Sequence, residues 1–178
     1  MDKENNFFGF IRDKLDIQIL ILYILDKLPY EISQARLSEL ALFDGGFTWF
    51  EFADGLASLV QTGQAGEADG KYVITEKGRR NLGYVAQSLP YSVRTKADRL
   101  AAQASAQMRR DRQIETGVES ARRGECAVSL RLSDGVGEVL SMRLAVPDEK
   151  TARGIEERFR KNAETLYQQI AELLLREE

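Results

Sequence analysis

The sequence contains no histidine, and cysteine occurs only once, as Cys126, among its 178 residues. Without histidine, neither a Ser-His-Asp triad nor a Cys-His pair can form, and a zinc site built from His and Cys ligands is excluded. A single cysteine also leaves no partner for a disulfide within the chain. We therefore expect no metal site and no cofactor, and we predict that the protein is not an enzyme.

Proline and long apolar runs are also scarce. The chain has three prolines, and its longest apolar run, residues 19–25, is far shorter than the roughly 20 residues that a membrane helix needs. The N-terminal sequence MDKENNFFGF lacks the basic start and the long apolar core of a signal peptide. We therefore expect a cytoplasmic protein of one or two small domains that does not associate with membranes.

Charge is unevenly distributed along the chain, although the net charge is only −3. Residues 1–70 contain 5 basic and 12 acidic side chains, whereas residues 71–123 contain 12 basic and 5 acidic ones. A local basic region can meet a phosphate backbone even when the whole chain is acidic. The same side chains would serve equally well as the solvated surface of helices, so both interpretations stay open.

The N-terminal part of the sequence shows the start and stop signals of three helices. Residues 13–28 are apolar on more than one side and end before Pro29, which predicts a buried helix. Ser33 and Thr48 are candidate N-caps of a short second helix and of a third helix at residues 49–62. The side of the third helix predicted to face the core consists of Trp49, Phe52, Ala53, Leu56, Leu59 and Val60.

A hairpin and two further helices are predicted next. The dipeptide Asp69-Gly70 separates two short segments and is typical of a hairpin turn. Thr75 is the candidate N-cap of a helix that Pro90 ends, and a longer helix is expected over residues 91–116. The narrow apolar seam of this longer helix consists of Val93, Ala97, Leu100, Ala104 and Met108.

The C-terminal part changes to an alternation of apolar and polar residues. This alternation over residues 126–132 and 140–146 predicts the two strands of a β-hairpin. Cys126 lies on the apolar side and is predicted to be a small buried side chain. A last helix is expected after Pro147. Its apolar stripe consists of Ile155, Phe159, Ala163, Leu166, Ile170 and Leu173.

Three helices followed by a hairpin and a helix are the element order of a winged helix. The stretches KLDIQILILYILDKL, FTWFEFADGLASLVQTGQ and DGKYVITEKGRRNL resemble winged-helix regulators. With the long helix and the C-terminal part included, roughly residues 10–175 resemble an uncharacterised bacterial family, domain of unknown function 4364. The resemblance implies a winged-helix domain, a small α+β tail and a regulatory role, and it assigns no active site.

These observations predict an α+β protein with three regions. The first, residues 12–90, is a winged helix-turn-helix domain, and the second, residues 91–123, is a long linking helical arm. The third, residues 124–178, is a β-hairpin plus an amphipathic helix that serves in dimerisation or sensing.

Candidate DNA contacts lie on the predicted third helix and on the elements around it. In a winged helix the third helix enters a DNA groove and the hairpin reaches a neighbouring groove or phosphate. The third helix has no Lys or Arg, so phosphate contacts are expected from the hairpin and the adjacent helices. The candidate residues are Arg36, Thr48, Phe50, Glu51, Asp54, Ser58, Lys71, Lys77, Arg79 and Arg80.

Two functions from different classes are consistent with the sequence. The first is a transcriptional regulator that binds double-stranded DNA as a homodimer formed through residues 91–178, with or without an effector. The alternative is a winged helix used as a protein-interaction module, in which Phe50, Glu51 and Asp54 contact a protein partner. The acidic charge of residues 1–70 favours the alternative.

Overall fold

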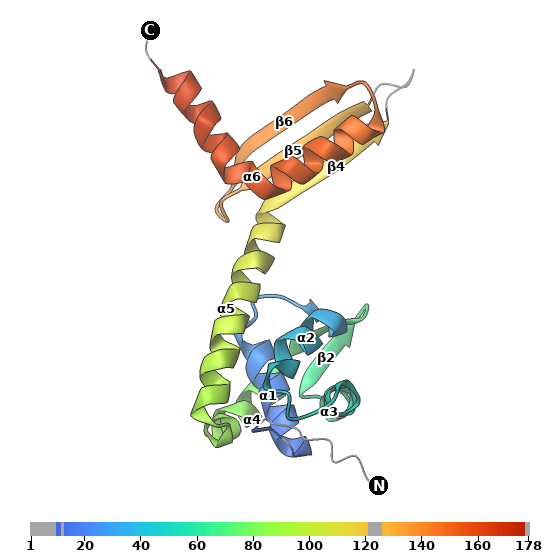
Figure 1. Ribbon diagram of the computed structural model, residues 1–178, viewed down its shortest axis with the longest axis vertical. Coiled ribbons are helices and arrows are strands. Elements are labelled where there is room, and N and C mark those ends of the chain that lie inside the picture. Colours follow the sequence, from blue (N-terminus) through green and yellow to red (C-terminus); the bar gives the residue numbers. More distant parts are fainter. Residues whose placement is uncertain (1–9, 12, 121–125, 177–178) are drawn as a thin grey trace. The chain divides into compact units, whose positions relative to one another are not determined.

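The computed structural model describes residues 10–11, 13–120 and 126–176. Within these residues the fold is α+β, with six α-helices and two antiparallel sheets of three strands each (Figure 1). The chain divides into two compact units, unit 1 at residues 1–108 and unit 2 at residues 109–178. The predicted α+β class is confirmed. The predicted boundaries after residues 90 and 123 stay predictions.

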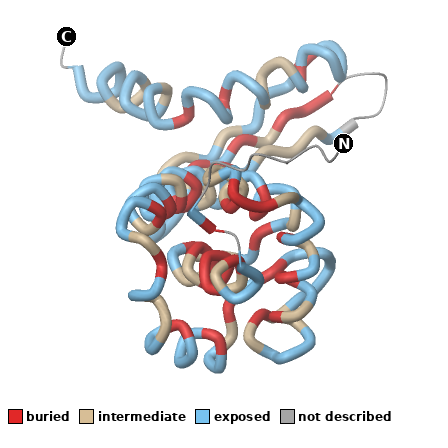
Figure 2. Tube along the Cα trace, turned by 60° about the horizontal axis from the view of Figure 1, so that its bottom comes forward, coloured by how far each residue is buried: buried red, intermediate tan, exposed pale blue. Residues whose placement is uncertain are grey.

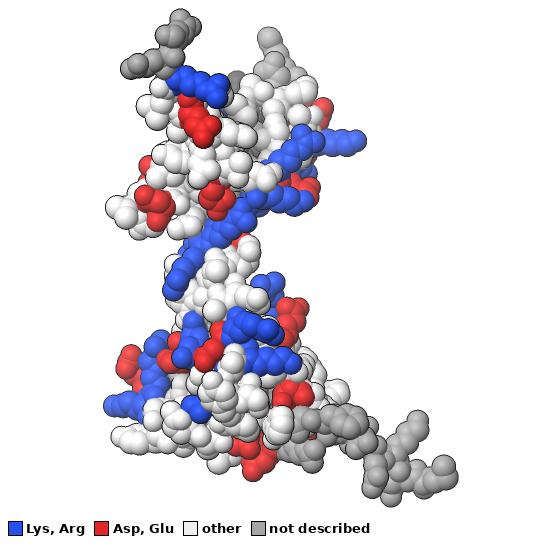
Figure 3. Space-filling view, turned by 60° about the vertical axis from the view of Figure 1, so that its left-hand side comes forward, with Lys and Arg blue, Asp and Glu red and all other residues white. Residues whose placement is uncertain are grey.

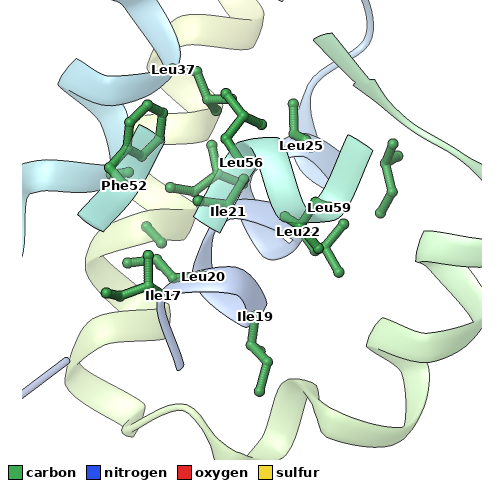
Figure 4. Packing of buried hydrophobic residues seen from close by; sticks show 14 of the residues in the cluster. Ile17, Ile19, Leu20, Ile21, Leu22, Leu25, Leu37, Phe52, Leu56 and Leu59 are labelled. Carbon is green, nitrogen blue, oxygen red and sulfur yellow. The ribbon is translucent and has the colours of Figure 1, made fainter. Parts of the chain in front are cut away.

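Helix α1, Lys14–Lys27, supplies seven buried apolar side chains to the core of unit 1. It begins at its N-cap Asp13, whose carboxylate accepts a hydrogen bond from the Leu15 amide at 2.8 Å. Figure 4 shows Ile21 of α1 packed near Phe52 and Leu56, which belong to a later helix. Burial on several sides explains why the apolar pattern of this helix is continuous instead of forming one stripe.

Helices α2, Gln34–Ala41, and α3, Trp49–Gln61, begin at the predicted caps. The Ser33 hydroxyl accepts from the Arg36 amide at 3.4 Å, and the Thr48 hydroxyl accepts from the Glu51 amide at 3.3 Å. The short 3-10 helix η1, Leu42–Asp44, lies between them and ends at Gly45, whose φ of 68° favours glycine. The predicted starts of both helices are confirmed.

The sheet of unit 1 contains β1, Ile32–Ser33, β2, Ala65–Ala68, and β3, Lys71–Ile74, in the order β1-β3-β2. The β2–β3 hairpin turns at Asp69 and Gly70, whose φ values of 51° and 71° suit a two-residue hairpin turn. The predicted hairpin is therefore confirmed. The short strand β1 was not predicted.

Helix α4, Glu76–Val85, is followed by the short 3-10 helix η2, Ala86–Ser88, and by helix α5, Tyr91–Gln113, of which residues 91–108 belong to unit 1. Buried positions gather inside unit 1 in Figure 2, and those of α5 there are Val93, Ala97, Ala101 and Ala104. The Ser105 hydroxyl also donates to the Lys27 carbonyl of α1 at 3.0 Å. This packing accounts for much of the apolar seam seen in the sequence.

Unit 2 contains a sheet of three strands, β4, Ile114–Ser120, β5, Cys126–Ser133, and β6, Glu138–Val146, in the order β4-β5-β6. The predicted hairpin is confirmed as the antiparallel pair β5–β6, and the third strand, β4, was not predicted. Strand β4 follows α5 directly, with no glycine or proline to end the helix, so the sequence suggested a longer helix. Its strand conformation is fixed by pairing with β5, for example Thr116 opposite Leu130.

Helix α6, Glu149–Leu175, lies mainly over β4 and β5. Its Phe159 side chain belongs to the core of unit 2, together with Ala152 and Ala163. The helix is kinked at Asn162, where φ is −131°. Leu173, the last position of the predicted apolar stripe, is 68% exposed.

Candidate nucleic-acid interface

Helix α3 has one buried side and one exposed side. Phe52, Leu56 and Leu59 anchor it in the core of unit 1. The exposed side follows a helical spacing of four, three and four residues. It consists of Phe50, Asp54, Ala57 and Gln61. Because the core contacts and the cap fix the helix, this exposed side is a rigid surface that a ligand could contact.

The two acidic side chains of α3 are engaged within unit 1. Glu51 accepts hydrogen bonds from the Thr48 amide at 2.7 Å and from the Thr48 hydroxyl at 2.9 Å, which forms a capping box. The Asp54 carboxylate pairs with the Lys14 ammonium of α1 at 2.7 Å. The Lys14 ammonium therefore offsets the charge of Asp54, whereas Glu51 keeps its charge at the N-terminus of α3, where the helix dipole favours it.

Two aromatic side chains lie exposed at the start of α3. Phe50 is 78% and Trp49 is 49% exposed, and their rings pack edge to face with centroids 5.5 Å apart. The prediction that Trp49 faces the core is wrong. Phe47, which precedes the helix, is buried in the core of unit 1.

The β2–β3 hairpin and the start of α2 bring two predicted cations into one neighbourhood. Lys71 is opposite Ser33 in the sheet, and Ser33 caps the helix that carries Arg36. Lys71 lies 3.7 Å from Glu31, and Arg36 lies 4.0 Å from Glu39. Both ion pairs are exposed, so they contribute only about 0–1 kcal/mol and can exchange for a phosphate.

The neighbouring Tyr72 is buried on the other side of β3. Burial, followed by the charge of the adjacent Glu67 carboxylate and a hydrogen bond to it, raises the pKa of Tyr72. The phenol therefore stays neutral near neutral pH and anchors the hairpin in unit 1.

The cations of α4 point to different neighbours. The Lys77 ammonium donates to the Thr62 carbonyl at the end of α3 at 2.7 Å, where the helix dipole favours a positive charge. Arg79 pairs with Asp26 of α1 at 3.1 Å. The Arg80 side chain is exposed and makes no hydrogen bond or ion pair within the described residues. Arg80 is thus the least committed of the predicted cations.

The structure places the predicted site residues in two groups. The first group lies on α3 and at its two ends. Thr48 is the N-cap, Lys77 contacts the C-terminal end, and the residues on the helix are Phe50, Glu51, Asp54 and Ser58. The other group consists of separate cations on α2, β3 and α4. Its members are Arg36, Lys71, Arg79 and Arg80. On the face of unit 1 in the lower part of Figure 3, Lys and Arg lie beside Asp and Glu.

Sequence reasoning missed three residues of this surface. Lys14 neutralises Asp54, and Ala57 and Gln61 belong to the exposed side of α3. The helical period from Phe50 and Asp54 could have identified Ala57 and Gln61. No local signal could have identified Lys14, because its position depends on how α1 packs on α3.

Unit 1 also has a shallow groove of about 320 Å³ between α1, α3 and α4. Leu15, Ile19 and Tyr84 line its apolar part, and Asn81 donates to Gln64 at 3.0 Å in its polar part. Nowhere in the described ranges do three or more Cys, Asp or Glu side chains form a group that could hold a metal ion. Across the same ranges, no helix combines the length and apolar character needed to cross a membrane.

The fold and this surface define a two-unit α+β protein with an exposed, well-anchored helix. Comparison with protein families matches residues 17–174 to the family described as Domain of unknown function (DUF4364). The match spans most of the chain, so the protein belongs to this family, as the resemblance in the sequence predicted. No curated protein and no solved structure gives a significant match.

Proposed function

We propose that this protein is a winged-helix transcriptional regulator that binds double-stranded DNA and acts as a homodimer. The element order α1-β1-α2-α3-β2-β3 and the sheet order β1-β3-β2 support a winged helix in unit 1. In this arrangement α3 is the helix that enters the major groove, and the β2–β3 hairpin is the wing.

The observation that carries the proposal is the compensated exposed side of α3. Lys14 offsets the charge of Asp54, and the capping box holds the Glu51 carboxylate against the Thr48 amide, so α3 repels a phosphate backbone less than two free carboxylates would. Thr48, Phe50 and Gln61 then meet the groove. Lys71 and Arg80, with Arg36, Lys77 and Arg79, supply the phosphate contacts that position the duplex.

The proposal is tested by titrating a short random-sequence duplex into the full chain at several salt concentrations. We expect the affinity to fall steeply as the salt concentration rises. In a plot of log association constant against log salt concentration, each phosphate contact contributes a slope of about −0.9. Lys71→Ala and Arg80→Ala should each lower this slope by about 1. Arg99→Ala is the matched control, because Arg99 of α5 is also an exposed cation of unit 1. Absence of salt-dependent binding would contradict DNA binding.

A second candidate function is a winged helix that binds a protein. The exposed Trp49–Phe50 pair favours it, because large exposed aromatic side chains are typical of protein interfaces. Phe50→Ala should then abolish binding to the partner while Arg80→Ala leaves it unchanged. The DNA regulator predicts the opposite order of effects on duplex binding.

A further inference from the structure

Helix α6 leaves part of the sheet in unit 2 uncovered. It contacts β4 and β5 more than β6, so an open groove of about 410 Å³ lies between β6 and the helix. The groove is lined mainly by apolar side chains, and Leu144 of β6 is 41% exposed. The apolar lining comprises Leu130, Met142, Leu144, Ile155, Phe159 and Leu166. Strand β6 is also an edge strand, whose outer backbone groups have no strand partner within the described residues.

The same helix carries an apolar segment that has no counterpart to cover it. After the kink at Asn162, Ala163 and Leu166 still pack in the core of unit 2, and only the end of the helix, residues 170–175, lies away from the sheet (Figure 1). Ile170 is half-buried, and Leu173, Leu174 and Leu175 are 68%, 80% and 80% exposed. Contiguous exposed apolar side chains of this kind mark an interaction surface.

The two segments of α6 carry opposite charges. Residues 149–161 contain five basic and three acidic side chains, a net charge of +2. Residues 163–175 contain two acidic side chains and no basic one. Glu164 pairs with Arg110 at 2.9 Å, so Glu172 is the acidic side chain of this segment that stays available to a partner. Arg158 lines the groove and Glu172 lies on the apolar segment, and neither side chain forms an ion pair within the described residues. The groove and the segment are therefore complementary in both polarity and charge.

We propose that a second copy of this chain covers the groove, with residues 170–175 of each copy lying in the groove of the other. A two-fold axis fills both grooves at once, because each copy offers the same groove and the same segment. Antiparallel packing of the two α6 helices sets the positive segment of one against the negative segment of the other. This inference deepens the proposed function, since it identifies the homodimer interface, but its tests need no DNA.

The first test is the molar mass of the full chain by light scattering at micromolar concentration, where we expect a dimer. Leu173→Asp together with Leu174→Asp should weaken dimerisation roughly thirtyfold or more, because carboxylates replace the apolar contacts. Val136→Asp is the matched control, since Val136 is 97% exposed in unit 2 and lies outside the proposed interface. A monomeric unsubstituted chain, or an Asp variant that dimerises as before, would overturn the proposal.

The second test reverses one charge on each side of the interface. Arg158→Glu and Glu172→Arg should each weaken dimerisation roughly tenfold, because like charges then face each other twice in the dimer. Mixing the two variants should restore a heterodimer, since each of its contacts again joins opposite charges. A mixture as weak as either variant alone, or single variants that dimerise normally, would overturn the arrangement. A monomer that still binds DNA would contradict this inference and leave the DNA proposal standing.

Discussion

Gly78, in the first turn of α4, shows how a single residue is constrained by packing. A Cβ at this position would lie 2.2 Å from the Gln64 carbonyl oxygen and 2.9 Å from Ile74. The Gln64 carbonyl cannot move freely, because it accepts hydrogen bonds from the amide and the hydroxyl of Thr75, both at 3.0 Å. Gly78 therefore allows α4 to pack closely on the segment that joins α3 to β2.

The contrast with Gly83 gives a matched test. Gly83 lies in the same helix, and a Cβ there would have no atom within 4 Å. We expect Gly78→Ala to destabilise the protein by about 1–3 kcal/mol or more. Gly83→Ala should stabilise it by about 0.5–1 kcal/mol, because alanine favours the helix. Urea unfolding of both variants measures the difference, and equal effects would contradict this account.

Sequence alone predicts those residues of the candidate site whose role is local. Ser33, Thr48 and Thr75 were predicted as caps, because a cap depends only on the next three residues. The Lys14–Asp54 pair could not be predicted, because its partners are 40 positions apart and meet only through packing. The close approach of Gly78 to the Gln64 carbonyl could not be predicted either, because it also arises only through packing.

At the scale of elements, α6 depends on Asp148 as its N-cap. Hydrogen bonds from Thr151, chiefly from its backbone amide at 2.7 Å, lower the pKa of the Asp148 carboxyl below its ordinary value of 3.8. A carboxyl group whose pKa is lower in the folded than in the unfolded state stabilises the fold at pH values above its unfolded-state pKa. This contribution is present above about pH 4 and is lost as the pH falls through the folded pKa.

Asp148→Asn tests this contribution. Asparagine is an equally good N-cap but does not titrate. We expect the variant to have nearly unchanged stability at neutral pH and a smaller loss of stability on acidification than the unsubstituted protein. Thermal unfolding at neutral pH and near pH 3 gives the comparison. If both proteins lose the same stability in acid, the cap does not contribute to acid sensitivity.

The elements themselves were predictable to different degrees. Helix α1 has a cap and a continuous apolar run, and α3 has a capping box and a clear apolar period, so both appear where the sequence predicts them. Strands β1 and β4 are formed by pairing with distant strands, at Tyr72 for β1 and along β5 for β4. Such pairing leaves little local signal. Neither the two residues of β1 nor the seven residues of β4 show a distinctive alternation of apolar and polar side chains.

At the scale of the whole molecule, α5 determines which residues a fragment must contain for unit 1 to be stable. Val93, Ala97 and Ala101 are at most 2% exposed and belong to the core of unit 1. A fragment that ends at residue 90 lacks them, whereas a fragment that ends at residue 113 keeps them. We expect the shorter fragment to be less stable by roughly 3 kcal/mol or more. Chemical unfolding of both fragments tests this, and equal midpoints would contradict it.

The single cysteine makes the two units distinguishable in solution. Cys126 is buried in unit 2, as its place in the alternating strand pattern predicts, and unit 1 has no thiol at all. A thiol-reactive dye therefore labels the native protein only when unit 2 opens, so its rate reports the opening free energy of that unit alone. Under conditions that unfold only unit 1, circular dichroism should change while labelling stays slow. Rapid labelling of the native chain would show that Cys126 is accessible without opening.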